Sequence, residues 1–414
     1  MESEWKMVPI GSLCEGIYDG PHATPVRTDS GPVFLGISSL VNGRLDLSRS
    51  DHLSEADFPR WTKRVTPRKH DLVFSYETRL GEAALIPDSL RCCLGRRMAL
   101  MRIDSKKADP HFLLYAFLSP QFQDVIRSRT KQGSTVQRIL LTEFADFPIA
   151  VPDVWEQQAI GRILSSLDDR IAVTEEANQS LEAIAQAIFK SWFVDFDPVR
   201  AKAEGREPDG MDADTAALFP SEFEETPLGP VPCGWNVVNL GQLAEFAYGK
   251  PLKAENRNGG RFPVMGSNGR VGWHDEALVL GPGIVVGRKG NPGTVTWVDS
   301  DFFPIDTTFF VRPRNLARGL YILKNQLDFL NLPDLSADSA VPGLNREMAY
   351  QTRLANPPKL IANIFQDIVD PLVAKAAQNE GLVAILADLR DTLLPRLISG
   401  KLRVQEAEAM LTAV

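Results

Sequence analysis

The chain of 414 residues contains one pattern twice. A globular stretch is followed by a long segment with heptad spacing, and the same pair then recurs. Seven residues of the first globular stretch recur without a gap 230 positions later, and five residues of the first heptad segment recur 201 positions later. Two copies of a globule and a helix predict near two-fold symmetry within one chain and a partner that is itself two-part. The recurring residues are Trp5, Val8, Gly11, Leu13, Glu15, Tyr18 and Pro21 in the first set, and Asp169, Asn178, Leu181, Ala183 and Ile184 in the second.

These patterns divide the chain into five parts. We expect a first globular domain at residues 1–150, a first helical region at 151–195, a linker at 196–230, a second globular domain at 231–355 and a second helical region at 356–414. The linker is rich in proline and acidic residues, which favours irregular structure. Both globular stretches mix strand-like and helical runs, so the predicted fold class is mixed α/β (α+β).

Particular elements can be predicted within the globular stretches. In the first, alternating apolar runs predict strands at 71–76 and 99–103, and one helix is expected over 110–129. In the second, glycine-rich turns separate strands expected at 284–286 and 294–298.

The two helical regions carry apolar residues at alternating steps of four and three, the 3.5-residue period of a coiled-coil seam. We expect the helices to pack on each other, because this stripe is longer than one globule needs; the alternative is that each helix packs on its own globule. Asn178 and Asn379 lie in mid-stripe, where a buried amide fixes the register, and Pro371 and Pro395 predict a bend or a break in the second helix. A helix of about 35 residues is roughly 50 Å long, so the pair would hold the globules a set distance apart. The predicted seam is Ile160, Leu164, Leu167, Ile171, Thr174, Asn178, Leu181, Ala185, Ile188 and Trp192 with Ile361, Phe365, Ile368, Leu372, Lys375, Asn379, Leu382, Leu386, Leu389 and Leu393.

The charge is distributed unevenly along the chain. A net charge of −8 argues at first against a nucleic-acid partner. However, residues 151–225 carry −11 and residues 356–414 carry −1, while residues 1–150 and 226–355 each carry +2. Both globular stretches are therefore weakly basic, as surfaces that bind phosphate groups are.

The sequence has no apolar run of the length of a signal peptide near Met1 and none of about 18 residues that could span a bilayer. A cytoplasmic protein is therefore expected. The four cysteines, Cys14, Cys92, Cys93 and Cys233, lack the spacing of metal ligands, so we expect reduced thiols and no metal site.

Eight segments of the chain carry a recognisable pattern: Phe147–Pro152, Glu156–Ile160, Ile163–Asp168, Ile188–Phe196, Val264–Gly269, Gly287–Gly290, Pro342–Arg346 and Leu394–Leu402. They resemble the specificity subunits of type I restriction-modification systems. The resemblance includes the repeat and extends over nearly the whole chain. It departs from the family pattern at Ala362 and Asn363, which stand where the second helix would carry a Glu–Gln pair.

This resemblance implies two target-recognition domains, each of which reads one half of a split, asymmetric DNA site, with antiparallel helices that set the spacer between the halves. It also implies a non-catalytic subunit that scaffolds two methyltransferase subunits and the translocating endonuclease subunits. S-adenosylmethionine, ATP and Mg²⁺ would then be bound by those partner subunits, and this chain would hold no cofactor. Two recognition domains on one scaffold also gain affinity through their effective concentration.

Basic clusters in both globular stretches are candidates for contact with DNA. Arginine can bridge guanine and glutamine can bridge adenine in the major groove, while lysine and hydroxyl groups hold phosphates. A basic run is also common on any solvated surface. The candidates are Arg60, Lys63, Arg64, Arg68, Lys69, Arg96, Arg97, Arg129, Lys131, Gln132, Ser134 and Thr135 in the first stretch, and Arg257, Arg261, Ser267, Asn268, Arg270, Arg288, Lys289, Arg312 and Arg314 in the second.

Two alternatives to a DNA-reading subunit remain at this point. Asp88, Asp104 and Lys106 have the order of a PD-(D/E)xK nuclease, whose carboxylates hold Mg²⁺, although the pattern is short and common. The chain could also be a coiled-coil adaptor that does not read DNA. The segment 356–359, Asn-Pro-Pro-Lys, is similar to the Asn-Pro-Pro-aromatic motif of adenine methyltransferases but lacks the aromatic residue that stacks on a flipped base. Prolines that precede the second helix explain this segment better.

Overall fold

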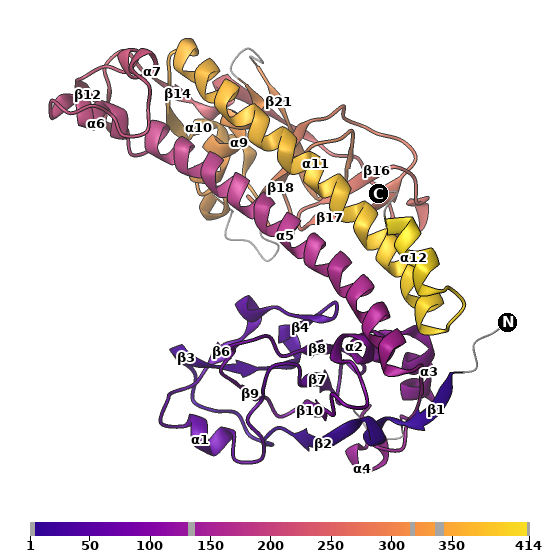
Figure 1. Ribbon diagram of the computed structural model, residues 1–414. Helices are drawn as coiled ribbons and strands as arrows, with labels where there is room; N and C mark the ends of the chain where they lie inside the picture. The colour runs from indigo at the N-terminus through magenta and orange to yellow at the C-terminus, as the bar shows by residue number, and fades with distance from the viewer. Residues whose placement is uncertain (1–4, 131–136, 315–318, 336–342, 412–414) are drawn as a thin grey trace. The chain divides into compact units, whose positions relative to one another are not determined.

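The computed structural model describes residues 5–130, 137–314, 319–335 and 343–411. The chain forms two compact units. Unit 1 comprises Met1–Thr174 with Leu382–Val414, and unit 2 comprises Glu175–Gly381. Each unit contains one globular domain and a part of both long helices, which are coloured magenta and yellow in Figure 1.

The long helices are α5, Val154–Phe193, and α11, Lys359–Ile398. Within unit 2 the amide of Asn379 donates to that of Asn178, and further along α5 the ring of Phe189 contacts Phe365. Phe189 follows Asn178 along α5, whereas its partner Phe365 precedes Asn379 along α11, so the helices are antiparallel. Within unit 1 the second half of α11 packs in the same core as the first half of α5. The helices therefore pack on each other, as the heptad spacing predicts.

Two details of α11 differ from the prediction. Pro371 and Pro395 do not break the helix, which is continuous through both. Pro371 is exposed, and Val369 and Leu372 on either side of it pack into the core of unit 2, which holds the flanking turns. The buried face also leaves the strict heptad: Ile368 is 39 % exposed, whereas Val369 is fully buried. The buried position is thus one residue later than the heptad predicts, because α11 packs on the globular domain as well as on α5.

The globular domain of unit 1 is built on a four-stranded sheet of order β2-β10-β7-β8, a three-stranded sheet of order β6-β3-β9 and the pair β1–β11. In the three-stranded sheet, β3 is antiparallel to β6 and parallel to β9. The strands are β1 Lys6–Pro9, β2 Cys14–Asp19, β3 Thr28–Leu35, β4 Leu40–Val41, β5 Arg44–Leu45, β6 Asp51–His52, β7 Leu72–Ser75, β8 Ala83–Leu85, β9 Cys92–Leu94, β10 Met98–Ile103 and β11 Pro148–Val151.

The helix expected over 110–129 is two helices. The helices α2, Pro110–Leu118, and α3, Pro120–Arg129, meet at Ser119. Pro120 disfavours helical backbone at the residue before it, and Ser119 is extended and caps α3 by accepting the N–H of Phe122. The other helices of unit 1 are α1 Phe58–Trp61, α4 Leu141–Phe144 and α12 Val404–Leu411.

The globular domain of unit 2 repeats the topology of these three sheets, while the hairpin β4–β5 of unit 1 has no counterpart among its described strands. Its sheets have the orders β15-β21-β18-β19 and β17-β16-β20, with β14–β22 as the separate pair. The middle strand β16 is again antiparallel to one neighbour and parallel to the other. The internal repeat read from the sequence is thus a repeat of fold. The strands are β14 Asn236–Asn239, β15 Ala244–Tyr248, β16 Phe262–Gly266, β17 Gly269–His274, β18 Gly283–Gly287, β19 Val295–Val298, β20 Phe303–Pro304, β21 Thr308–Pro313 and β22 Arg353–Asn356, and the helices are α8 Leu240–Leu243, α9 Leu320–Phe329 and α10 Arg346–Gln351.

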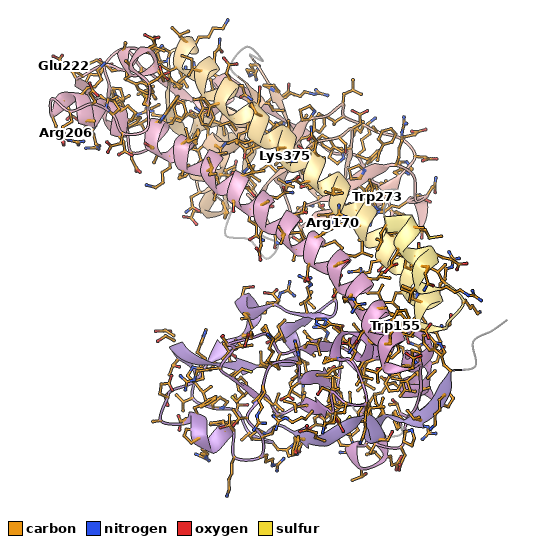
Figure 2. The ribbon with its side chains drawn as sticks, in the orientation of Figure 1. Trp155, Arg170, Arg206, Glu222, Trp273 and Lys375 are labelled. Atoms are coloured by element: carbon orange, nitrogen blue, oxygen red, sulfur yellow. The ribbon has the colours of Figure 1, made fainter. Side chains whose placement is uncertain are left out.

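The tract 196–230 is ordered, so the expectation of an irregular linker is wrong. It forms α6, Asp197–Ala203, α7, Ala213–Ala217, and a hairpin of β12, Phe223–Thr226, with β13, Gly229–Pro232. Apolar residues scattered among the prolines and acids explain this. Val199 and Phe219 are buried in the core that contains the end of α5, while Arg206 and Glu222 lie on the surface of this tract (Figure 2).

No helix among the described residues is long and apolar enough to cross a membrane.

All four cysteines are free thiols. Burial raises the pKa of Cys92 and of Cys93 to about 12.

Candidate nucleic-acid interface

The basic candidates of unit 1 lie on α1, in the loop between α1 and β7, in the turn between β9 and β10, and at the end of α3. Several are already paired within the unit. Arg64 pairs with Asp19, Lys69 with Asp88 at 3.0 Å, and Arg97 with Glu77 at 3.8 Å. These cations are only partly available to a phosphate. The guanidinium of Arg129 lies over the ring of Phe147 and donates weakly to a backbone carbonyl.

Other candidates of unit 1 are exposed, and none of the described residues pairs with their charged groups. Their positive charge is therefore free to meet a polyanion. They are Arg60, Lys63, Arg68 and Arg96. Four further candidates, Lys131, Gln132, Ser134 and Thr135, lie outside the described residues.

In unit 2 many of the candidate arginines lie over aromatic rings. Arg261 lies over Phe262, Arg270 over Trp273 and Arg312 over Phe310, each with its Cζ within 4.9 Å of the ring centre. A guanidinium stacked on a ring keeps its edge free for planar hydrogen bonding.

Two arginines of unit 2 serve the fold instead. Arg257 donates to the carbonyls of Leu252 and Val271, and Arg314 donates to that of Gly241 at 2.8 Å.

The turn between β16 and β17 carries Ser267 and Asn268, both of which are predicted to contact DNA. It is tied to the loop after β18, because the hydroxyl of Thr294 donates to the carbonyl of Ser267 at 2.8 Å. The loop after β18 presents Arg288 and Lys289. The structure thus brings together candidates that are more than 20 residues apart in the sequence.

A buried network in unit 1 was not predicted. Asp168 on α5 accepts a hydrogen bond from the hydroxyl of Tyr115 on α2 at 2.6 Å and from Arg390 on α11 at 2.7 Å. Burial and the neighbouring carboxylate raise the pKa of Tyr115, so its hydroxyl stays a donor. The network fastens the globular domain of unit 1 to both helices.

Unit 2 has a different connection between its globular domain and α5. The side chain of Lys324 on α9 is only 7 % exposed and pairs with Asp328 at 3.0 Å and with Glu182 of α5 at 3.3 Å. Burial would lower the pKa of Lys324, but these carboxylates outweigh it and the pKa is raised. The pair borders a cavity of about 580 Å³ lined also by Arg270, Trp273, Trp297 and Glu380, of which Trp273 is labelled in Figure 2.

The long helices also carry exposed apolar side chains. In unit 1, Trp155 is 62 % exposed and Ile385 is 55 % exposed, and in unit 2 Ile184 is 49 % exposed. Trp155 lies near the start of α5 (Figure 2). They are spaced along both helices, since Trp155 and Ile184 lie on α5 and Ile385 lies on α11.

The carboxylates of the nuclease alternative have separate partners. Asp88 pairs with Lys69, while Asp104 accepts the backbone N–H of Lys106 and pairs with Lys107 at 3.3 Å. Among the described residues there is no group of three or more His, Cys, Asp and Glu side chains that could hold a metal ion.

Comparison with known proteins agrees with this geometry. Residues 2–183 match the family described as type I restriction modification DNA specificity domain. The chain is 24 % identical to the type I restriction enzyme HindI specificity subunit of Haemophilus influenzae, over 97 % of this chain and all of that protein. It is also 24 % identical to the MjaIX specificity subunit of Methanocaldococcus jannaschii, over 71 % of this chain and 69 % of that one.

A solved structure, the type I restriction-modification system S subunit from M. genitalium, has a similar fold. It superposes with a TM-score of 0.60 at 18 % identity, over 95 % of this chain and 96 % of that one. The repeated fold and the paired helices agree with these matches: residues 2–183 belong to the type I restriction modification DNA specificity domain family, and the chain as a whole is similar to specificity subunits of type I restriction-modification systems.

Proposed function

We propose that this chain is a non-catalytic subunit whose two globular domains each read one half of a split, asymmetric DNA site. The observation that carries this proposal is that two domains of one topology present different basic side chains. The four unpaired candidates of unit 1 lie over no aromatic ring among the described residues, whereas Arg261, Arg270 and Arg312 of unit 2 do. Because side chains in contact with bases determine which sequence is read, two domains of one fold with different surface side chains are expected to read two different half-sites.

The helices α5 and α11 would set the length of the spacer between the half-sites, because each is continuous through the boundary between the units. Two methyltransferase subunits and the endonuclease subunits would bind the complex, and the exposed Trp155, Ile184 and Ile385 offer apolar contacts for such partners. S-adenosylmethionine, ATP and Mg²⁺ would be bound by those subunits. The free thiols suit a reducing compartment such as the cytoplasm.

Selection from a pool of random duplexes by the purified full chain tests this proposal. We expect two short constant sequences separated by an unconstrained spacer of fixed length. Replacement of the exposed Arg60 and Arg96 in unit 1 by glutamine should alter only one of the two constant sequences or its affinity. One contiguous sequence, or no enrichment, would contradict the proposal.

The two alternatives predict other outcomes. A nuclease would cut plasmid in the presence of Mg²⁺ and lose that activity in Asp104→Ala. An adaptor would show no salt-dependent binding to the selected duplex, whereas a DNA-binding subunit should show a steep loss of affinity with salt.

A further inference from the structure

Tyr248 at the end of β15 is the centre of a group of cations and rings in unit 2. The Cζ of Arg288 lies 4.9 Å from the centre of the Tyr248 ring, and that of Arg346 lies 5.2 Å from it. Phe309 and Tyr350 complete the group, since Arg288 also lies over Phe309 and Arg346 over Tyr350. We call these five residues the Tyr248 cluster. The Tyr248 side chain is 51 % exposed, so the cluster meets solvent.

The Tyr248 cluster is held in place by the surrounding backbone. Arg288 donates to the carbonyl of Asp306 at 3.0 Å, and its own carbonyl accepts the N–H of Leu344 at 3.0 Å, which joins the loop after β18 to the segment before α10. The hydroxyl of Tyr350 accepts the N–H of Phe246 at 2.7 Å and ties α10 to β15. The two guanidinium groups therefore need little rearrangement to bind a ligand.

The cluster carries positive charge that the protein does not neutralise. Among the described residues no carboxylate pairs with Arg288. Arg346 has one carboxylate partner, Glu347 at 3.3 Å, whose side chain is 73 % exposed and therefore screened by water. Two guanidinium groups beside one ring repel each other, and an anion with several oxygens would relieve this repulsion.

The described residues of unit 1 do not form this arrangement, although its tyrosine is conserved within the repeat. Tyr18 occupies the position of Tyr248, and the guanidinium of Arg102 lies 5.9 Å from its ring centre. However, Arg102 donates two hydrogen bonds to Asp71, at 2.8 and 3.1 Å, and a third to the carbonyl of Thr66. The charge of Arg102 is therefore neutralised within the protein, unlike that of Arg288 in unit 2.

We propose that Arg288 and Arg346, held on Tyr248, together grip one backbone phosphate of DNA and so position the second recognition domain on its half-site. This inference rests on the proposed function, since it assigns one contact within that DNA complex. Phosphate contacts position a protein and carry no sequence information of their own. The cluster should therefore add affinity equally to all sequences.

The test measures the affinity of the full chain for the selected duplex over a range of salt concentrations. We expect Arg288→Gln to lower the affinity equally for the selected duplex and for duplexes altered in the second half-site. The slope of log K against log salt should fall by about 0.9, the value of one phosphate contact. Because both arginines grip the same phosphate, the slope of R288Q/R346Q should fall no further than that of either single variant.

The ring itself is tested separately. Tyr248→Phe keeps the stacking surface and should bind as the wild type does, whereas Tyr248→Ala should bind more weakly. Arg206→Gln is the matched control, because Arg206 is an exposed arginine of unit 2 that pairs with Glu204, and this variant should change neither affinity nor slope.

Duplexes with one neutral methylphosphonate at a time locate the contact. One position should weaken binding by the wild type and have no effect on Arg288→Gln. An unchanged salt slope in Arg288→Gln, or a changed preference among bases, would overturn the phosphate assignment while the wild type still binds its bipartite duplex. Absence of salt-dependent binding by the wild type would instead overturn the proposed function.

Discussion

Asp168 shows how one buried charge can join three elements of unit 1. Its side chain is 10 % exposed and that of Arg390 is 21 % exposed, so neither charge is fully solvated. Each oxygen of the carboxylate has its own donor, Tyr115 on one side and Arg390 on the other. A buried charge that has all its partners is tolerated, whereas one that loses a partner is costly.

We predict that the two partners of Asp168 differ in their contribution to stability. Tyr115→Phe removes one hydrogen bond to a charged group and should lower the free energy of unfolding by about 1.5–3 kcal/mol. Arg390→Met leaves a buried carboxylate without its cation and should lower it by about 3–5 kcal/mol. Urea unfolding followed by tryptophan fluorescence measures both.

The control for these variants is Arg170→Met, since Arg170 lies exposed on α5, the helix that carries Asp168 (Figure 2). It should change the free energy of unfolding by less than about 0.5 kcal/mol. Equal effects of Arg390→Met and Arg170→Met would show that the ion pair does not stabilise unit 1.

At the scale of elements, the pairing of α5 with α11 includes a pair of asparagines within an apolar seam. Asn379 is 6 % exposed, and its side-chain amide donates to the Oδ1 of Asn178. The Nδ2 of Asn178 in turn donates to the carbonyl of Ala376 at 3.1 Å. An amide pair in such a seam costs stability but permits only one alignment of the helices.

We predict that the two asparagines act as a unit. Asn379→Leu alone removes the donor to Asn178 and should lower the free energy of unfolding by about 1–3 kcal/mol. The double variant N178L/N379L should be more stable than that single variant, because both polar partners are then gone. Thermal unfolding of the wild type, both single variants and the double variant completes the cycle, and simply additive effects would contradict the prediction.

The heptad spacing and the repeat were sufficient to predict two globular domains and two mutually packed helices, because periodicity is a local property of the sequence. The prediction failed where local signals compete with packing. The tract 196–230 has the composition of a linker but is ordered by the burial of Val199 and Phe219, and Ser119 with Pro120 ends a helix that the apolar pattern continues.

The site was less predictable than the fold. Arg288 was a candidate, but its partners Tyr248 and Arg346 come from segments 40 and 58 residues away and are joined only by sheet pairing and loop contacts. The network of Asp168 likewise depends on Arg390, 222 residues further along. Nothing in the local composition around these residues marks such pairs, although the recurrence of Tyr18 as Tyr248 was a signal that one position of the repeat mattered.

At the scale of the whole molecule, one fold occurs twice with different surfaces. The same strand order and the same mixed pairing of the middle strand occur in both units. The charged groups nevertheless differ, since Arg102 is neutralised by Asp71 in unit 1, whereas no carboxylate among the described residues of unit 2 pairs with Arg288. Under the proposed function, such a molecule keeps its scaffold constant and varies its recognition surfaces.

We predict that the spacer between half-sites follows the length of the helix pair. One heptad inserted after Asn178 together with one before Asn379 keeps the antiparallel register and lengthens both helices by about 10 Å, which equals about 3 base pairs of DNA. Duplex selection should then return the same two half-sites with a spacer longer by about three. An unchanged spacer would show that the helices do not set this length.

The strand pairs β1–β11 and β14–β22 have a consequence for how such proteins diversify. In each unit the chain enters the globular domain along one strand and leaves it along the neighbouring strand, with Val8 opposite Ile149 in the first and Val238 opposite Leu354 in the second. The points at which the chain enters and leaves each globular domain are therefore adjacent. Under the proposed function, a gene exchange that replaces the segment between these two strands would change the DNA sequence that the subunit reads. The strand pair itself, and hence assembly with the other subunits, would stay the same.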